Sequence, residues 1–200
     1  MTSPAQSRTL DAAFDLYVTG GIDAVSMREL AGRIGITAPA LYKHFAHKDA
    51  LIEAIAERGF LLFEKRLRLR PATRPLGRIA AVLEAYRDFA LNEPHLFEIM
   101  FAAPRARLRR YPADFAAGRS GTFNLLRAAV DEGMAQRRLK KDDALEVTLD
   151  LWAYAHGLIG LYRAGRFGTE AAAFRRLFDR AIKRLLAGLS APKGGKRAAR

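Results

Sequence analysis

A capping pattern within residues 26–48, SMRELAGRIGITAPALYKHFAHK, constrains the fold more than any other stretch of this chain. Ser26 is followed three residues later by Glu29, which forms the capping box of a helix N-terminus. In this box the Ser26 hydroxyl accepts from the Glu29 N–H, and the Glu29 carboxylate reaches back to the Ser26 N–H. The pattern predicts a short helix that begins at residue 26 and is ended by Gly32 and Gly35. Gly35 can adopt the positive φ that a tight turn needs.

A second short helix is expected directly after this turn, over residues 37–45. Thr37 is its N-cap, and Pro39 is tolerated because a first-turn N–H has no helical partner. Leu41 and Phe45 are its apolar anchors. Two helices joined by a Gly-containing turn form a helix-turn-helix, and in DNA-binding versions the second helix enters the major groove. The pattern therefore predicts a DNA-binding domain.

Residues 8–55 also resemble a known family, the TetR-type (tetracycline-repressor-like) transcriptional regulators. The matching pieces are Phe14, Gly20, the run SMRELAGRIGIT and the run ALYKHFAHKDAL, and the most specific part is LY-x-HF followed by Lys48. The resemblance implies an N-terminal DNA reader and a C-terminal helical domain for ligand binding and dimerisation. It implies ligand-responsive transcriptional control, more often repression, in which a small molecule shifts the long helix and changes the spacing of two readers.

The resemblance further implies which residues contact double-stranded DNA. Tyr42 and His44 are expected to reach phosphates, and Lys43 a phosphate or a base edge. Lys48 is expected to pair with a phosphate at the start of the next helix, where free N–H groups favour anions. Arg28 is the candidate for guanine, whose O6 and N7 atoms arginine binds most often. The predicted set is Arg28, Thr37, Ala38, Ala40, Tyr42, Lys43, His44 and Lys48.

Three positions in this stretch limit what it can do. Ala38 and Ala40 offer only methyl contacts, for example with thymine. His47 stands where the family usually has Ser or Asn as a helix cap, so we expect a weaker cap there.

Composition favours an all-α protein. Half of the residues are apolar, and Ala, Leu, Arg and Glu, which are good helix formers, dominate. The chain has no cysteine, which excludes a disulfide scaffold, a thiolate nucleophile and a Cys-ligated zinc site. We expect neither a metal nor a cofactor. No signal peptide is visible, and the longest uncharged run, residues 151–162, is too short to span a bilayer. We therefore expect no membrane partner and a cytoplasmic location.

The formal net charge of +13 suits a polyanionic partner, but its distribution does not point to the reader. Residues 1–70 hold 10 Lys or Arg and 8 Asp or Glu, whereas residues 101–140 hold 9 and 3. For the basic run at 104–112, a solvated charged surface is a better interpretation than a dedicated anion site. The motif therefore locates the DNA site better than the charge does.

Apolar periodicity predicts the remaining helices and the domains. The expected domains are a helix-turn-helix domain at 1–50, a helical ligand-binding and dimerisation domain at 51–190, and a disordered basic tail at 191–200. In addition to the two short helices, the expected helices span about 5–19, 48–70, 76–91, 94–101, 120–137, 143–165 and 169–189.

The C-terminal half carries many aromatic side chains on apolar helix faces, with few polar groups among them. Such a set predicts either a dry core or a pocket for a small hydrophobic effector, aromatic or long-chain, without a fixed charge. Trp152 and His156 share a helix face, and the run WAYAHG resembles the Trp-His-Gly class of C-terminal domains in the family. His156 or Tyr86 would orient the effector. The predicted lining residues are Tyr86, Phe89, Phe97, Met100, Phe101, Phe123, Leu126, Trp152 and His156.

Small residues form a ridge on the helix expected at 143–165. They are Ala153, Gly157, Gly160 and Ala164. Such a ridge lets another helix approach closely, either within the chain or from a second copy. Together with the apolar helix at 169–189, it predicts a homodimer through the last two helices.

Two other functions remain open from the sequence. The first is a non-specific architectural DNA binder that uses the basic tail. The second is an all-α enzyme with His156 or His95 as a base, for which no partner acid or nucleophile is visible. The sequence does not give the operator, the effector or the sign of regulation.

Overall fold

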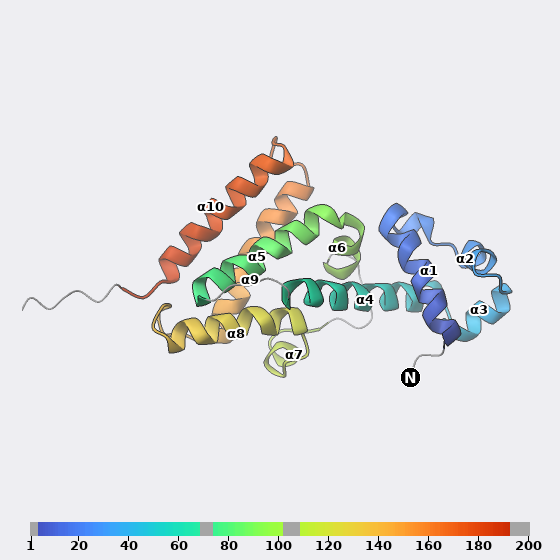
Figure 1. The fold of residues 1–200 in the computed structure, drawn as a ribbon, viewed down its shortest axis with the longest axis horizontal. Helices are drawn as coiled ribbons and strands as arrows, with labels where there is room; N and C mark the ends of the chain where they lie inside the picture. Colours follow the sequence, from blue (N-terminus) through green and yellow to red (C-terminus); the bar gives the residue numbers. More distant parts are fainter. Residues whose placement is uncertain (1–3, 69–73, 102–108, 193–200) are drawn as a thin grey trace, which may run out of the picture. The chain divides into compact units, whose positions relative to one another are not determined.

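A computed structural model of the chain describes residues 4–68, 74–101 and 109–192 (Figure 1). These residues are almost entirely helical, with one isolated bridge between Leu139 and Ser190. The fold is therefore all-α, as the composition predicted. The elements are α1 Pro4–Gly20, η1 Ile22–Ala24, α2 Met27–Arg33, α3 Ala38–His44, α4 Lys48–Arg68, α5 Pro75–Asn92, α6 Pro94–Phe101, α7 Ala113–Ala116, α8 Gly121–Ala135, α9 Ala144–Arg163 and α10 Ala171–Leu189.

The chain divides into two compact units. The first contains residues 1–63 and 89–108, and the second contains residues 64–88 and 109–200. The division runs through α4 and α5, so both helices contribute residues to both units. The domain boundary predicted at residue 50 stays a prediction.

In the first unit, α1, α2 and α3 pack against one another and α6 packs on α1. The core of this unit is apolar, and Leu30, Leu41, Leu51 and Ile55 are fully buried. Gly21 ends α1 with a φ of 68°, and its N–H donates to the Tyr17 carbonyl at 2.8 Å. A side chain at Gly21 would also press on the His95 ring, since a Cβ there would lie 3.0 Å from its Nδ1. These contacts form the three-helix unit that the sequence predicted.

In the second unit, α9 packs against both α8 and α10, and these helices lie side by side in Figure 1. The loop before α9 meets the end of α10, where the Lys140 N–H donates to Leu189 O at 2.9 Å and the Ala191 N–H donates to Arg138 O at 3.0 Å. The N-terminal end of α9 therefore lies beside the C-terminal end of α10, and the two helices run antiparallel. The inner face of α10 is fully buried at Phe174 and Phe178.

Helix ends agree with the expected ranges to within about two residues, which is the usual ambiguity of such boundaries. Gly32 lies inside α2 rather than after it, so Gly35 alone supplies the turn conformation. The sequence did not predict η1 or the four-residue helix α7. The predicted tail from residue 193 onward, and the basic run at 104–108, lie outside the described residues.

Candidate nucleic-acid interface and aromatic cluster

Two side-chain caps define the helices of the motif. The Ser26 hydroxyl accepts from the Glu29 N–H at 3.4 Å, and the Thr37 hydroxyl accepts from the Ala40 N–H at 3.4 Å. Both capping residues have the extended backbone expected of an N-cap, with ψ values of 130° and 152°. The caps fix where α2 and α3 begin, as the sequence predicted.

The turn between α2 and α3 is built around Gly35, which has a φ of 70°. Directly after it, the Ile36 N–H donates to the Ala31 carbonyl at 3.0 Å. Leu41 and Phe45 hold α3 on the core, with 0% and 5% of their surfaces exposed. The second helix of the motif is thus fixed on its inner side, which leaves its outer side to meet a partner.

The predicted DNA-contacting residues divide by exposure. Tyr42 keeps 48% of its surface exposed, which is unusual for a large aromatic side chain. Arg28, Thr37 and Lys43 are also exposed, whereas Ala38, Ala40, His44 and Lys48 are half-buried. The side chains therefore come from the cap of α3, the outer side of α3, the first turn of α2 and the start of α4.

Lys48 has a local partner that the sequence did not suggest. Its Nζ donates to the Ile22 carbonyl at 3.1 Å and so ties the first residue of α4 to η1. An ammonium group has three N–H donors, so this hydrogen bond leaves Lys48 able to bind a phosphate as well.

His47 is the cap of α4, because its Nδ1 accepts from the Ala50 N–H at 3.1 Å. An imidazole nitrogen accepts only when that nitrogen is unprotonated. Sequence reasoning expected a weaker cap at this position and did not anticipate a ring nitrogen as the acceptor.

Five of the nine predicted effector-site residues belong to the second unit, and four of them form an aromatic cluster with Phe115 of α7. Ring centroids lie 4.8 Å apart for Phe115 and Phe123, 6.0 Å for Phe115 and Trp152, and 6.1 Å for Trp152 and His156. Phe115 was missed because α7 was not predicted. In the following text, the aromatic cluster means Tyr86, Phe115, Phe123, Trp152 and His156; the fifth predicted residue, Leu126, is buried in α8.

The polar atoms of this cluster form a short chain of hydrogen bonds. The Tyr86 hydroxyl lies 2.7 Å from His156 Nδ1, and the Trp152 side chain also hydrogen-bonds to Tyr86. An indole N–H can only donate, so the Tyr86 oxygen accepts from Trp152, whereas the direction of the Tyr86–His156 hydrogen bond depends on which ring nitrogen of His156 carries the proton. When the neutral His156 ring carries its proton on Nε2, Nδ1 accepts from the Tyr86 hydroxyl.

Burial keeps both groups of this pair neutral. Burial raises the pKa of Tyr86 far above its usual range, and the hydrogen bond from Trp152 only partly opposes this. Burial lowers the pKa of His156 below its usual value of 6.5. The cluster is therefore an apolar environment that contains two neutral hydrogen-bonding groups.

The other four predicted effector-site residues belong to the first unit. The Phe97 and Phe101 rings lie 5.0 Å apart, Phe101 meets Phe60 edge-to-face at 5.3 Å, and Phe89 lies 4.7 Å from Phe63. Met100 is 1% exposed and packs on Gly59, where a Cβ would lie 2.7 Å from its sulfur.

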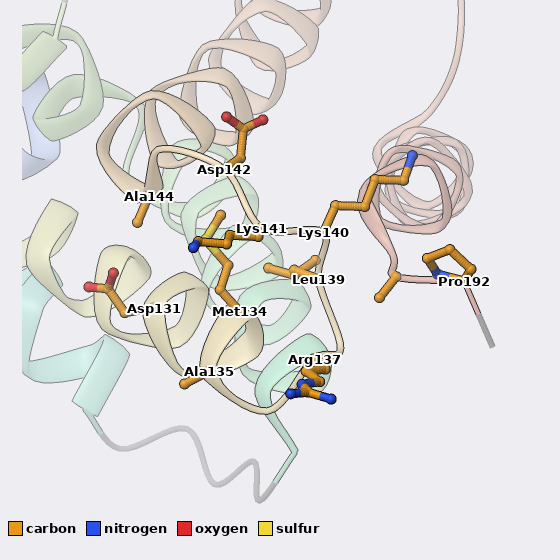
Figure 2. A pocket seen from close by; sticks show the side chains of 11 residues that line it. Asp131, Met134, Ala135, Arg137, Leu139, Lys140, Lys141, Asp142, Ala144 and Pro192 are labelled. Carbon is orange, nitrogen blue, oxygen red and sulfur yellow. The ribbon is translucent and has the colours of Figure 1, made fainter. Parts of the chain in front are cut away.

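A separate pocket opens on the second unit where α8 ends (Figure 2). It has a volume of about 920 Å³. Figure 2 shows its lining side chains coming from the end of α8, the loop that leads into α9 and the residues after α10. None of the nine predicted effector-site residues lines it. The lining residues are Asp131, Met134, Ala135, Arg137, Leu139, Lys140, Lys141, Asp142, Ala144, Ala191 and Pro192.

Taken together, the capped helix-turn-helix and the exposed face of α3 define a DNA-binding protein of the helix-turn-helix class. The description "Bacterial regulatory proteins, tetR family" matches residues 10–55, and "Tetracyclin repressor-like, C-terminal domain" matches residues 79–185. The chain therefore belongs to the TetR family of bacterial regulatory proteins and is a DNA-binding transcriptional regulator. Its likeness to the Trp-His-Gly class stays a prediction.

Two curated relatives match part of the chain. The HTH-type transcriptional activator FasR of Mycolicibacterium smegmatis is 33% identical over 98 residues, which is 48% of this chain and 45% of FasR. The class A tetracycline repressor protein of Escherichia coli is 44% identical over 57 residues, 28% of this chain and 26% of the repressor. The matches span less than half the length of either relative.

A solved structure matches nearly the whole fold. A protein of unknown function from Rhodococcus sp. RHA1 is 27% identical with a TM-score of 0.76, and the match covers 94% of this chain and 96% of that one. Within the described ranges of the present chain, no helix is both long and apolar enough to cross a membrane.

Proposed function

We propose that this chain is a ligand-responsive repressor that binds a palindromic operator as a homodimer and is released by a small apolar molecule. The observation that carries this proposal is an α3 that is buried on its inner side and exposed on its outer side, together with a neutral aromatic cluster in the second unit. The class A tetracycline repressor supports repression, whereas FasR, an activator, makes the sign of regulation a point for experiment.

Exposure supports the proposed DNA contacts. Tyr42 and Lys43 project from the outer side of α3, and Arg28 is exposed on α2. A phenolic hydroxyl and an ammonium suit phosphate oxygens, and a guanidinium suits guanine O6 and N7. Lys48 is proposed to keep its hydrogen bond to Ile22 while it binds a phosphate at the N-terminus of α4.

The aromatic cluster supports an uncharged apolar effector. Its side chains are mostly carbon, and Tyr86 and His156 are both held neutral. An effector with a fixed charge would need an opposite charge in the cluster, and no Lys, Arg, Asp or Glu belongs to it. An apolar molecule with one hydrogen-bonding group would enter by separating Phe123 from Trp152 and would be oriented by His156.

The outer face of α9 supports a dimer. A Cβ at Gly157 or Gly160 would meet no atom within 4 Å, so the glycines of the ridge are not filled by a neighbouring helix of the described chain. Tyr154 and Leu161 on the same helix are 40% and 49% exposed. The close approach that the ridge allows is therefore proposed for a second copy.

Selection of bound sites from random double-stranded DNA tests the operator proposal. The expected product is a near-palindrome with half-sites about one helical turn or more apart. A pool without sequence preference would favour the architectural alternative. A reporter placed behind the selected site then gives the sign, because a repressor lowers transcription from it.

The effector proposal is tested with Trp152, which is the only tryptophan of the chain. Small aromatic and long-chain compounds are titrated while Trp152 emission and operator release are followed together. Compounds that release DNA should also change the emission, and His156→Ala should weaken them with DNA affinity nearly unchanged. Release without any change in emission would place the effector elsewhere.

A further inference from the structure

The pocket at the end of α8 has no role in the proposed function, and we call it the α8-end pocket (Figure 2). Its wall is held by hydrogen bonds between the loop after α8 and the end of α10, from the Lys140 and Ala191 N–H groups and from Lys140 Nζ, which donates to Gly188 O at 2.8 Å. Leu139 is 2% exposed and packs on Gly133 of α8. The volume of about 920 Å³ suits a small molecule, and such sites are mostly formed before the ligand arrives.

Two cations of the lining have positive charge to offer. Arg137 and Lys141 are exposed, and within the described ranges of the chain neither side chain forms a hydrogen bond or an ion pair. Lys140 is the third cation of the lining, and its Nζ is already bound to Gly188 O. Figure 2 shows Arg137 and Lys141 extending from the loop between α8 and α9. The available charge of the pocket is therefore on Arg137 and Lys141.

Two carboxylates also line the pocket, and they limit the charge of a ligand. Asp142 accepts from the Asp143 N–H at 2.8 Å, and Asp131 lies 3.8 Å from Arg127. Three cations and two carboxylates in the lining leave one positive charge over. A ligand with a single negative charge neutralises it, whereas a doubly charged phosphate would bring a second negative charge toward Asp131 and Asp142.

The rest of the lining is mostly carbon, and it favours a ligand with an apolar part. Met134 and Ala144 are half-buried, so both present some carbon surface to the pocket. A small inorganic anion would leave this surface in contact with water. An anion with an apolar body covers the surface and gains from doing so. The other apolar lining residues are Ala135, Leu139, Ala191 and Pro192.

Arg137 occupies a backbone position that normally belongs to glycine. It follows Gln136, the C-terminal cap of α8, and has a φ of 53°. The Arg137 N–H donates to Met134 O at 3.0 Å and the Arg138 N–H to Gly133 O at 2.8 Å, which is the pattern of a Schellman helix end. Among the residues that the structure describes, Arg137 is the only one other than glycine with a positive φ. A charged side chain kept where glycine would be unstrained indicates a function for that side chain.

We propose that the α8-end pocket is a second ligand site of this chain and binds an amphiphilic carboxylate, that is, one carboxylate on an apolar chain or ring. The planar guanidinium of Arg137 matches a carboxylate with two parallel N–H donors, and Lys141 supplies a further donor. The apolar body covers Met134 and Ala144. The site is distinct from the aromatic cluster, since the two share no residue and the cluster favours an uncharged molecule.

Calorimetric titration of the full chain with sodium decanoate, below the concentration at which it forms micelles, tests the site. One decanoate should bind per chain, and its affinity should fall as ionic strength rises. Acetate, which has the charge without the apolar chain, should bind at least tenfold more weakly. Decanol has the chain without the charge, and Arg137→Ala should not change its binding.

Arg137→Ala and Lys141→Ala should each weaken decanoate about tenfold, because each removes a charged hydrogen bond. Arg138→Ala is the matched control, since it removes the same charge from an exposed neighbour that does not line the pocket. Its decanoate affinity should equal that of the unmutated chain.

Arg137→Gly separates binding from the helix end. It should weaken decanoate as much as Arg137→Ala does, but only the glycine variant should raise the urea midpoint of the chain, because alanine is strained at a φ of 53° as arginine is. A residue that served the helix end alone would change stability and leave decanoate binding as it was.

Three results would overturn the proposal. Equal decanoate affinity in Arg137→Ala and the unmutated chain would show that Arg137 binds no carboxylate. An equal loss in Arg138→Ala would show a general attraction of the basic loop for anions. A loss in His156→Ala, with none in Arg137→Ala, would place decanoate in the aromatic cluster and leave the α8-end pocket without a ligand.

Discussion

The Tyr86 hydroxyl lies 2.7 Å from Nδ1 of His156 and joins α5 to α9 inside the second unit. The Trp152 side chain hydrogen-bonds to the same Tyr86, so the emission of the only tryptophan reports on this pair. This hydrogen bond also explains why the sequence did not distinguish a dry core from an effector pocket for these aromatic residues. Without an effector the polar atoms of the cluster satisfy one another, which is what a packed core requires, and both groups remain ones that an effector can engage.

The first prediction concerns pH. Burial lowers the pKa of His156 below 6.5, so the unfolded chain takes up a proton near pH 6.5 and the folded chain only at lower pH. Between the pKa of His156 in the folded chain and its pKa in the unfolded chain, the unfolded state binds more protons, so the free energy of unfolding rises with pH. The full contribution is therefore present above about pH 6.5 and is lost as the pH falls below it.

Urea unfolding followed by Trp152 emission at several pH values between 5 and 8 checks this sign. His156→Asn, whose amide oxygen can take the place of Nδ1, should lose less stability on acidification than the unmutated chain. Tyr86→Phe is the matched variant for the hydrogen bond, and it should cost about 1 kcal/mol at pH 8. Equal pH dependence in the unmutated chain and His156→Asn would contradict the assignment.

The second prediction concerns the residues of the helix-turn-helix that are proposed to bind DNA. Tyr42→Phe removes one hydroxyl and keeps the ring, so it should weaken binding to all sequences, and Lys48→Ala should also reduce the salt slope by about 1. Arg28→Ala should instead relax preference at one base pair, by about 1–3 kcal/mol. Affinities from gel shifts at several salt concentrations separate these effects.

Two controls are needed for these DNA-binding variants. Lys65→Ala removes an exposed charge near the other end of α4 and should change little. Because Lys48 also holds the Ile22 carbonyl, its variant needs a melting curve to show that the first unit remains folded. Unchanged operator affinity in both Tyr42→Phe and Lys48→Ala would contradict the proposed binding of α3 to DNA.

The third prediction concerns the cap of α4. His47→Ala removes the acceptor of the Ala50 N–H and should destabilise the chain by about 0.5–2 kcal/mol, whereas His47→Ser should restore most of the loss. Hydrogen exchange at the Ala50 amide gives a local readout besides urea unfolding. The same exchange rate in the unmutated chain and His47→Ala would show that the ring is not the cap.

The sequence was most informative where the structure depends on local contacts. The Ser26 and Thr37 side chains each cap a helix by accepting from the N–H three residues later. Gly35 has a positive φ, which favours glycine at that position. These features can be predicted because each is complete within one helical turn. The same holds for the apolar inner faces, since Leu41 and Phe45 lie at helical spacing.

The sequence was least informative where a side chain meets a partner far along the chain. Lys48 bonds to the carbonyl of Ile22, and nothing in the residue types indicates which carbonyl a lysine will find. The place of Phe115 in the aromatic cluster was not predicted. Helix α7 has only four residues, which is too short to show a helical periodicity of apolar residues.

The last prediction concerns Arg87, which joins α5 to α10 and is only 5% exposed. Its guanidinium donates from Nε to Asp88 at 3.0 Å, ion-pairs with Asp179, and lies 5.3 Å above the Phe178 ring. Arg175 also donates to Asp88 at 3.1 Å. Burial alone would raise the pKa of Asp88, but the hydrogen bonds and charges of Arg87 and Arg175 outweigh it and hold the pKa below its usual value.

Arg87→Ala should therefore destabilise the chain by about 3 kcal/mol, because it leaves two carboxylates short of a partner and a space beside Phe178. Arg87→Lys should recover only part of this, since an ammonium lacks the planar fork that reaches both carboxylates. Arg138→Ala, at an exposed position, is the control and should stay within about 0.5 kcal/mol of the unmutated chain. Urea unfolding at fixed protein concentration measures all three.

The pH dependence of the Arg87→Ala loss distinguishes charge from packing. Because the pKa of Asp88 is lowered in the folded state, its contribution is complete above the unfolded value of about 3.9 and is lost as the pH falls from there through the lower folded value. The difference between Arg87→Ala and the unmutated chain should shrink below about pH 4, where Asp88 of the unfolded chain takes up a proton while Asp88 of the folded chain is still charged. A difference that stays constant down to pH 3 would mean that Arg87 stabilises the fold by packing on Phe178 rather than through its ion pairs.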